Sequence, residues 1–228
     1  VGADFLSKFI ISGFQSFKAL SPELCKPFDT ERCGLNLGEA AATMIFQYKV
    51  ESRKYKVGEH QPKTDTPNFL LSTNDFLLIN GAIRNDATHI SAPSRVGEGS
   101  YRALKNILQN IDTEQIAFIN AHGTATPYND SMEAQAIFRA GLQNVPVNSL
   151  KPFFGHTLGA AGVLESIISM KALQNNIILP TLNFKSQNFE NQLNVSTEIQ
   201  KTDKKYFIKM LSGFGGVNTV LLFEKNTI

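Results

Sequence analysis

The feature that most constrains the fold is an alternation of apolar strands and helices between residues 116 and 174. Residues 116–121 and 145–148 are short apolar runs of the kind that form buried strands. Residues 130–140 and 158–174 have the length and spacing of helices that pack on one face. A strand–helix–strand–helix order predicts parallel βαβ units, and therefore an α/β fold.

Further elements are predicted on both sides of this region. They are a helix over 4–20, a buried strand over 40–50, a strand over 77–83, a helix over 99–109 and two closing strands over 206–210 and 217–223. The closing strands are expected to pair antiparallel, since only a glycine-rich turn separates them. Residues 51–68 are charged, contain proline and lack periodicity, which indicates a surface connection.

Composition excludes several classes of function. The 228 residues are 42% hydrophobic and 18% charged, which is typical of a globular protein with a normal core. A net charge of +2 indicates neither a nucleic-acid partner nor a membrane surface, and no run of about 18 apolar residues is present. The start has no initiator methionine and no signal-peptide pattern, so we expect a cytoplasmic chain cut from a longer protein.

The chain has two cysteines, Cys25 and Cys33. Without a secretion signal, reduced thiols of a cytosolic protein are the favoured interpretation. A disulfide and half of a metal site are the alternatives.

His122 follows the strand predicted over 116–121 and precedes a helix whose expected N-cap is Asn129 or Asp130. Ligands of open α/β sheets bind at the carboxyl ends of the strands, where this histidine lies. The alternative is a histidine that only holds its loop together.

His156 repeats this arrangement after the next strand. Because the two histidines are one βαβ unit apart, both side chains are expected at the same edge of the sheet. Zinc needs at least three protein ligands, and no third one has suitable spacing, so no metal is expected. Neutral imidazoles that donate hydrogen bonds to a developing oxyanion fit better, and a following helix start disfavours imidazolium at His156.

Three further residues have two interpretations each. Lys151 is an anion ligand or catalytic amine, or else a solvated lysine. Glu165, on the predicted helix after His156, is its ion-pair partner or a solvated carboxylate. Phe214 lies among glycines, which allow a ligand to approach closely, or else it is a core residue in a plain turn.

Five segments, in this order, resemble the β-ketoacyl-acyl-carrier-protein synthases, the condensing enzymes of the thiolase-like superfamily. They are "PFDTERCGLNLGEAA", "DATHISAP", "NAHGTATPYND", "KPFFGHTLGAAGVLESI" and "GFGGVN". The resemblance runs from Val1 nearly to the end of the chain, and residues 51–76 match poorly.

The resemblance implies a layered αβαβα fold made of two similar halves. Residues 1–50 would be the tail of the N-terminal half, 51–75 a connection and 76–228 the C-terminal half. Family members extend an acyl chain by decarboxylative Claisen condensation with malonyl-carrier protein. The implied partners are acyl carrier protein and a second subunit, in a homodimer or heterodimer. No cofactor is implied, since the substrates are carried on phosphopantetheine.

Each candidate residue matches a family position. His122 and His156 resemble the two histidines that bind the malonyl thioester carbonyl and stabilise the enolate. Lys151 resembles the lysine that completes the catalytic set, with Glu165 as its partner.

Four other residues match positions around the substrate. Phe214 resembles the gating phenylalanine, whose backbone N–H can join the oxyanion hole. Thr124 and Thr126 match threonines that contact the pantetheine arm, and Arg32 matches a basic residue near the entrance, suited to an acidic carrier protein.

The chain also departs from the family pattern. The nucleophilic cysteine belongs upstream of Val1, and neither Cys25 nor Cys33 has its context, so this chain alone is expected to be inactive. Met210-Leu211-Ser212 replace the usual Asn-Ser-Phe, and Phe154 replaces a threonine. The alternative function is a non-catalytic partner subunit of the chain-length-factor type or a carrier-protein docking module. Retention of both histidines and Lys151 argues against it. The pathway, whether fatty acid, polyene or polyketide, stays open.

Overall fold

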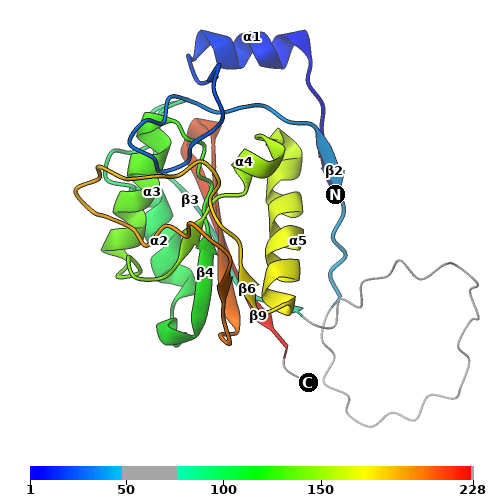
Figure 1. Ribbon diagram of the computed structural model, residues 1–228, viewed down its shortest axis with the longest axis vertical. Coiled ribbons are helices and arrows are strands. Elements are labelled where there is room, and N and C mark those ends of the chain that lie inside the picture. The colour runs from blue at the N-terminus through cyan, green and yellow to red at the C-terminus, as the bar shows by residue number, and fades with distance from the viewer. Residues whose placement is uncertain (48–75, 227–228) are drawn as a thin grey trace, which may run out of the picture.

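A five-stranded mixed sheet forms the centre of the computed structural model, which describes residues 1–47 and 76–226 (Figure 1). Its strand order is β3-β9-β8-β4-β5. The strands are β3 (Phe76–Asn85), β4 (Ile116–Asn120), β5 (Val147–Asn148), β8 (Tyr206–Gly213) and β9 (Val217–Lys225).

The pairing of these strands follows from their connections. Strand β4 is parallel to both β5 and β8, since a helix crosses over between β4 and β5. Strands β8 and β9 pair antiparallel from Tyr206 opposite Glu224 to Gly213 opposite Val217. The predicted parallel βαβ unit and the predicted closing hairpin are both present.

Helices cover both faces of the sheet (Figure 1). Helices α2 (Glu98–Ile107) and α3 (Pro127–Arg139) lie on one side, and α5 (Ala161–Gln174) lies on the other. Every residue of β4 is buried, as expected for a parallel strand between two helical layers. On the α5 side, Phe207 stacks between Phe118 and Phe223, with ring centroids 5.4 and 4.8 Å apart.

The N-terminal segment forms a separate ribbon. Strands β1 (Gly2–Asp4) and β2 (Ala40–Ala42) pair antiparallel, and α1 (Lys8–Ser16) stands apart from the sheet at the top of Figure 1. The helix predicted over 4–20 is therefore shorter at both ends. Its start is set by Ser7, whose hydroxyl accepts a hydrogen bond from the N–H of Ile10.

Of the buried strand predicted over 40–50, a strand is present over 40–42, and the prediction is wrong over 43–47. Strand β1 has three residues, so β2 has no pairing partner past Ala42 among the described residues, and the side chains of Ile45 and Phe46 are 77% and 61% exposed. Residues 48–50 and the connection predicted over 51–68 lie outside the described residues.

The remaining elements are short. They are η2 (Thr113–Gln115), α4 (Lys151–Phe154), η3 (Leu158–Ala160), β6 (Ile177–Ile178), β7 (Gln200–Lys201) and η4 (Phe214–Gly216). The helix predicted over 158–174 thus begins as a 3-10 turn that leads into α5. None of the helices within residues 1–47 and 76–226 has the length and apolar character that a membrane crossing requires.

Candidate functional site

The loop that carries His122 is held by two buried carboxylates of α3. Glu133 accepts hydrogen bonds from the backbone N–H groups of His122 and Gly123, both at 2.7 Å. Asp130 accepts one from the N–H of Thr124 at 3.0 Å. Sequence reasoning missed Glu133, although two acidic residues one turn apart near a helix start are a detectable signal.

The helix cap was predicted at the wrong residue. The N-cap of α3 is Thr126, because Pro127 occupies the first helical position. Proline is favoured there, since an N–H at that position would have no acceptor within the helix. Asp130 instead ties the histidine loop to the N-terminal segment, since its second oxygen accepts the N–H of Phe28 at 2.7 Å. Burial raises the pKa of Asp130 to about 6 and, together with the charge of Asp130, that of Glu133 to about 7.

His156 lies between α4 and η3 and is held by the N-terminal segment. Its backbone N–H donates to the carbonyl of Asn36 at 2.7 Å, and its carbonyl accepts from the N–H of Gly38 at 3.1 Å. The preceding Gly155 has a φ of 74°, which favours glycine. Thus the ribbon before β2 fixes the second histidine from outside the sheet.

The two imidazoles meet at the same edge of the sheet, as their spacing predicts. Their ring centroids are 5.1 Å apart and the ring planes are inclined by 83°. The Nδ1 atom of His156 accepts the N–H of Leu158 at 3.1 Å, so the proton of the neutral ring is on Nε2. The Nδ1 atom of His122 is buried and has no hydrogen-bond partner among the described residues. A buried polar atom without a hydrogen-bond partner is energetically unfavourable, and a bound ligand that hydrogen-bonds to it would remove that cost.

Both imidazoles are neutral at physiological pH. Burial first, and the nearby ammonium of Lys151 second, lower the pKa of His156 to about 3. The pKa of His122 is also well below its usual range, first through burial and then through the charge of Lys151. Neutral rings can donate hydrogen bonds through N–H to a developing negative charge.

Behind the histidines is a buried charged network. The ammonium of Lys151 lies 2.8 Å from one oxygen of Glu165, and the ammonium of Lys209 pairs with the other. Lys209 also donates to the side-chain oxygen of Asn120 at 2.7 Å. Burial opposes ionisation of Glu165, but the two ammonium groups outweigh it and hold its pKa below the usual range. The interpretations of Lys151 and Glu165 as solvated residues are therefore wrong.

Sequence reasoning did not identify Lys209. The signal was a single lysine inside the apolar run "YFIKM" of a predicted strand. Lysine is almost never fully buried unless it is paired. In β8 it points to the interior, where its pairing partner comes from α5.

A cavity of about 970 Å³ adjoins both imidazoles. Thr124 and Thr126 also line it, and their hydroxyl oxygens are 2.8 Å apart. Phe214 lies at its edge with a side chain that is 54% exposed, so the interpretation as a core phenylalanine is wrong. Its ring contacts those of Phe14 and Phe17 in the α1 segment, at centroid distances of 5.8 and 5.2 Å.

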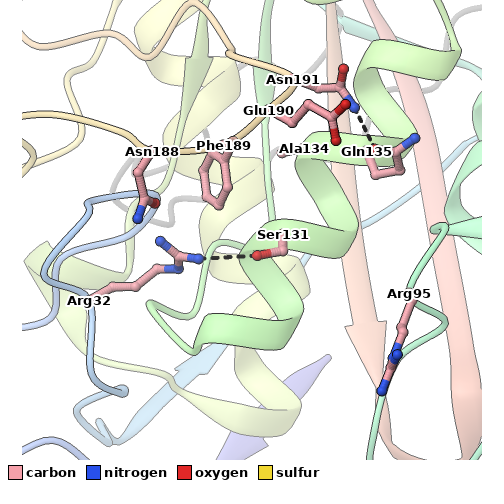
Figure 2. A pocket seen from close by; sticks show the side chains of 9 residues that line it. All are labelled: Arg32, Arg95, Ser131, Ala134, Gln135, Asn188, Phe189, Glu190 and Asn191. Carbon is pink, nitrogen blue, oxygen red and sulfur yellow. Dashed lines mark hydrogen bonds between the residues drawn. The ribbon is translucent and has the colours of Figure 1, made fainter.

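Arg32 lies apart from the histidines, at a second cavity of about 300 Å³ (Figure 2). Its guanidinium donates to the hydroxyl of Ser131 at 3.1 Å and to the carbonyl of Asp29 at 2.8 Å. It also stacks on the ring of Phe189 at 4.5 Å. Figure 2 shows Arg32 reaching toward Ser131, with Arg95 well apart from it. The Arg32 side chain is therefore held in place by the protein itself.

Both cysteines are free thiols, so the disulfide alternative is wrong. Cys25 is buried, and burial together with the charge of Asp130 raises its pKa to about 12. Cys33 is exposed, with its sulfur 3.1 Å from the hydroxyl of Ser21. Across residues 1–47 and 76–226, no three His, Cys, Asp or Glu side chains lie together in a way that would hold a metal ion.

Comparison with known proteins adds a family to this geometry. Residues 77–185 match the model of the β-ketoacyl synthase C-terminal domain. The chain is 32% identical over 232 aligned residues to 3-oxoacyl-(acyl-carrier-protein) synthase 2 of Staphylococcus aureus strain COL, which covers 96% of this chain and 52% of that protein. The chain thus spans about half the length of the curated relatives it matches.

Solved structures show the same relationship. A β-ketoacyl synthase from Burkholderia phymatum superposes with a TM-score of 0.79 at 26% identity, over 99% of this chain and 54% of that one. A ketosynthase from Xenorhabdus doucetiae, solved with its chain length factor, gives 0.77 at 28% identity, over 99% and 52%. The expected fold is confirmed by these matches. The chain belongs to the β-ketoacyl synthase family, as the C-terminal portion of its thiolase-like fold.

Proposed function

We propose that this chain is the histidine-bearing part of a β-ketoacyl-acyl-carrier-protein synthase, an acyltransferase that performs decarboxylative Claisen condensation. The observation that carries the proposal is the pair of neutral imidazoles, 5.1 Å apart, beside a cavity of about 970 Å³. The cavity is large enough for an acyl chain or a pantetheine arm.

The histidines act on the malonyl thioester. The bond from the central malonyl carbon to its carboxylate breaks, CO2 leaves, and the electron pair of that bond forms an enolate. The N–H groups of His122 and His156 donate to the enolate oxygen. Each such donor lowers the activation free energy by roughly 3–4 kcal/mol. The enolate carbon then attacks an acyl thioester, and a cysteine thiolate is the leaving group.

The nucleophilic cysteine is proposed to lie outside this chain, because Cys25 is buried with a raised pKa and the sulfur of Cys33 contacts the hydroxyl of Ser21, which is not a base. This chain alone then does not take up an acyl group. Incubation with an acyl thioester or a cerulenin-type probe, followed by intact-mass analysis, is expected to show no stable adduct. Acylation of either cysteine would contradict this assignment.

Substrate contacts are assigned by position around the cavity. Thr124 and Thr126 take the pantetheine arm, and Phe214 opens or closes access to the histidines. The partner is an acyl carrier protein, in line with a ketosynthase of the same fold that was solved with one. Arg32, at the neighbouring cavity, contributes positive charge toward that acidic partner. We further propose a cytoplasmic homodimer or heterodimer that uses no cofactor of its own.

The test is decarboxylation of malonyl-carrier protein by the complete protein. Changing His122 or His156 to Ala is expected to lower the rate by about 100-fold or more, the usual effect of losing one oxyanion donor. His89→Asn is the matched control. His89 is exposed, and the side-chain oxygen of Asn can replace its Nδ1 as the acceptor of hydrogen bonds from the backbone N–H groups of residues 91 and 92. Equal rates for all three variants and the unmodified protein would refute the proposal.

A chain-length-factor-like subunit is the second candidate. It is favoured by the match to the ishigamide ketosynthase/chain length factor, with a TM-score of 0.78 at 25% identity, and by the chain's departures from the family pattern. The complete reading frame separates the two candidates. A cysteine at a strand-to-helix elbow upstream of Val1 supports the enzyme, and its replacement supports the partner subunit.

A further inference from the structure

Lys209 is a buried ammonium group to which the proposed mechanism gives no role. It lies on β8, and its side chain has no exposed surface. Two lysines share the single carboxylate of Glu165, so the cluster Lys151–Glu165–Lys209 carries one uncompensated positive charge. Buried charge without full compensation is strongly unfavourable, which makes a purely structural lysine a poor explanation.

The contacts of Lys209 join the elements that carry the two histidines. Its ammonium donates to the side chain of Asn120 at 2.7 Å and to the carbonyl of Ala121 at 3.4 Å. These two residues directly precede His122. Through Glu165 it is linked to Lys151, the first residue of the short helix α4 that leads to His156.

We propose that Lys209 is a positioning residue for both histidines. Its ammonium locks the end of β4 to the Lys151–Glu165 pair, and its positive charge disfavours protonation of either imidazole. The chemical consequence rests on the proposed function, since it concerns the rate of enolate formation. The geometric part does not depend on that function.

The charged groups around Lys209 come from three helices, α3, α4 and α5. Glu165 on α5 and Glu133 on α3 favour its charged form, whereas Lys151 on α4 and burial disfavour it. The imidazoles of His122 and His156 face the same network, and Lys209 contributes to lowering the pKa of each. The balance lowers the pKa of Lys209 to about 8. Above that pH the ammonium loses its charge, and its bonds to Asn120 and Glu165 weaken.

The experiment measures malonyl-carrier-protein decarboxylation by the complete protein as a function of pH. Lys209→Met is expected to lower kcat about tenfold with KM unchanged, the effect of one charge-assisted hydrogen bond. The unmodified protein should lose activity as the pH rises through about 8, and this alkaline limb should be absent in the variant. Lys205→Met is the control, because Lys205 also pairs with a glutamate but is partly exposed and distant from the histidines.

A second variant and a second readout keep the proposal falsifiable. If Lys209→Met does not fold, Lys209→Gln, which keeps N–H donors without the charge, is measured in the same way. Two-dimensional ¹⁵N–¹H spectra of the imidazoles follow their protonation directly, and in either variant the ring of His156 should begin to protonate at higher pH. Unchanged kcat, alkaline limb and imidazole titration would overturn the proposal.

The two levels of inference can fail separately. No decarboxylation by the unmodified protein would refute the proposed function, whereas the imidazole titration would still decide the role of Lys209.

Discussion

Replacing Glu165 by Gln is expected to destabilise the protein strongly. Each carboxylate oxygen faces one ammonium, that of Lys151 at 2.8 Å and that of Lys209. All three side chains are almost completely buried. The amide would leave two adjacent ammonium groups without a counter-charge.

Breaking a buried pair in this way costs about 3–5 kcal/mol of unfolding free energy. For a chain of this size, that corresponds to a fall in melting temperature of roughly 6–20 °C. The loss should shrink as the pH rises through about 8, because Lys209 can then release its proton and relieve the repulsion.

The assay is urea unfolding at pH 7 and pH 9, with Glu224→Gln as the matched control. Glu224 pairs with Lys205 at a partly exposed site, so its change should cost at most about 1 kcal/mol. The double variant Glu165→Gln/Lys209→Met restores a single buried charge and should recover part of the stability. A Glu165→Gln protein as stable as the control, or a double variant no better than the single one, would refute this reasoning.

Three further predictions concern the loops and the thiols. The pKa of Glu133 is raised from 4.5 to about 7 in the folded protein, so between these pH values the folded state holds a proton that the unfolded state has released. Protonation of Glu133 therefore stabilises the fold at low pH, and this stabilisation is lost as the pH rises from about 4.5 to 7. Unfolding followed across that range should lose this slope in Glu133→Gln. A methyl group at Gly38 would overlap the backbone carbonyl of the last residue of α4, so Gly38→Ala should cost more than 1 kcal/mol in a thermal melt. By contrast, Gly13→Ala, in open space within α1, should stabilise the protein by about 0.5–1 kcal/mol. A Gly38→Ala protein that melts at a higher temperature than Gly13→Ala would contradict the close packing of Gly38 against α4. An alkylating reagent at pH 8 should modify Cys33 and spare Cys25, whose pKa is raised to about 12, and mass spectrometry of peptides would detect the opposite.

Local sequence signals were sufficient where periodicity and long-range pairing agree. The alternation over 116–174 predicts β4, α3, β5 and α5, and the glycine turn predicts the β8–β9 hairpin. The strand predicted over 40–50 failed over 43–47, where an apolar run has the appearance of a strand but has no pairing partner among the described residues. A strand needs a partner strand to pair with, so the three residues of β1 limit β2 to three paired residues.

In the candidate site, the sequence pattern likewise predicted some residues and not others. The repeat of a histidine after successive strands is visible in the sequence, and it places both rings at one edge of the sheet. The partner of Lys151 could be proposed, since Glu165 lies on the next helix. Neither Glu133 nor Lys209 was recognised, because acidic residues near a helix start and a lone lysine on a strand are most often solvated.

The sequence by itself determined the order of elements, the parallel unit and the pairing of two histidines across it. These depend on covalent spacing and on the handedness of the βαβ connection, both of which are local. The sequence also predicts neutral imidazoles, but only the tertiary structure showed the buried charged network behind them. The imidazoles are neutral, and two lysines share one carboxylate, because segments distant in the chain exclude water from the same small volume.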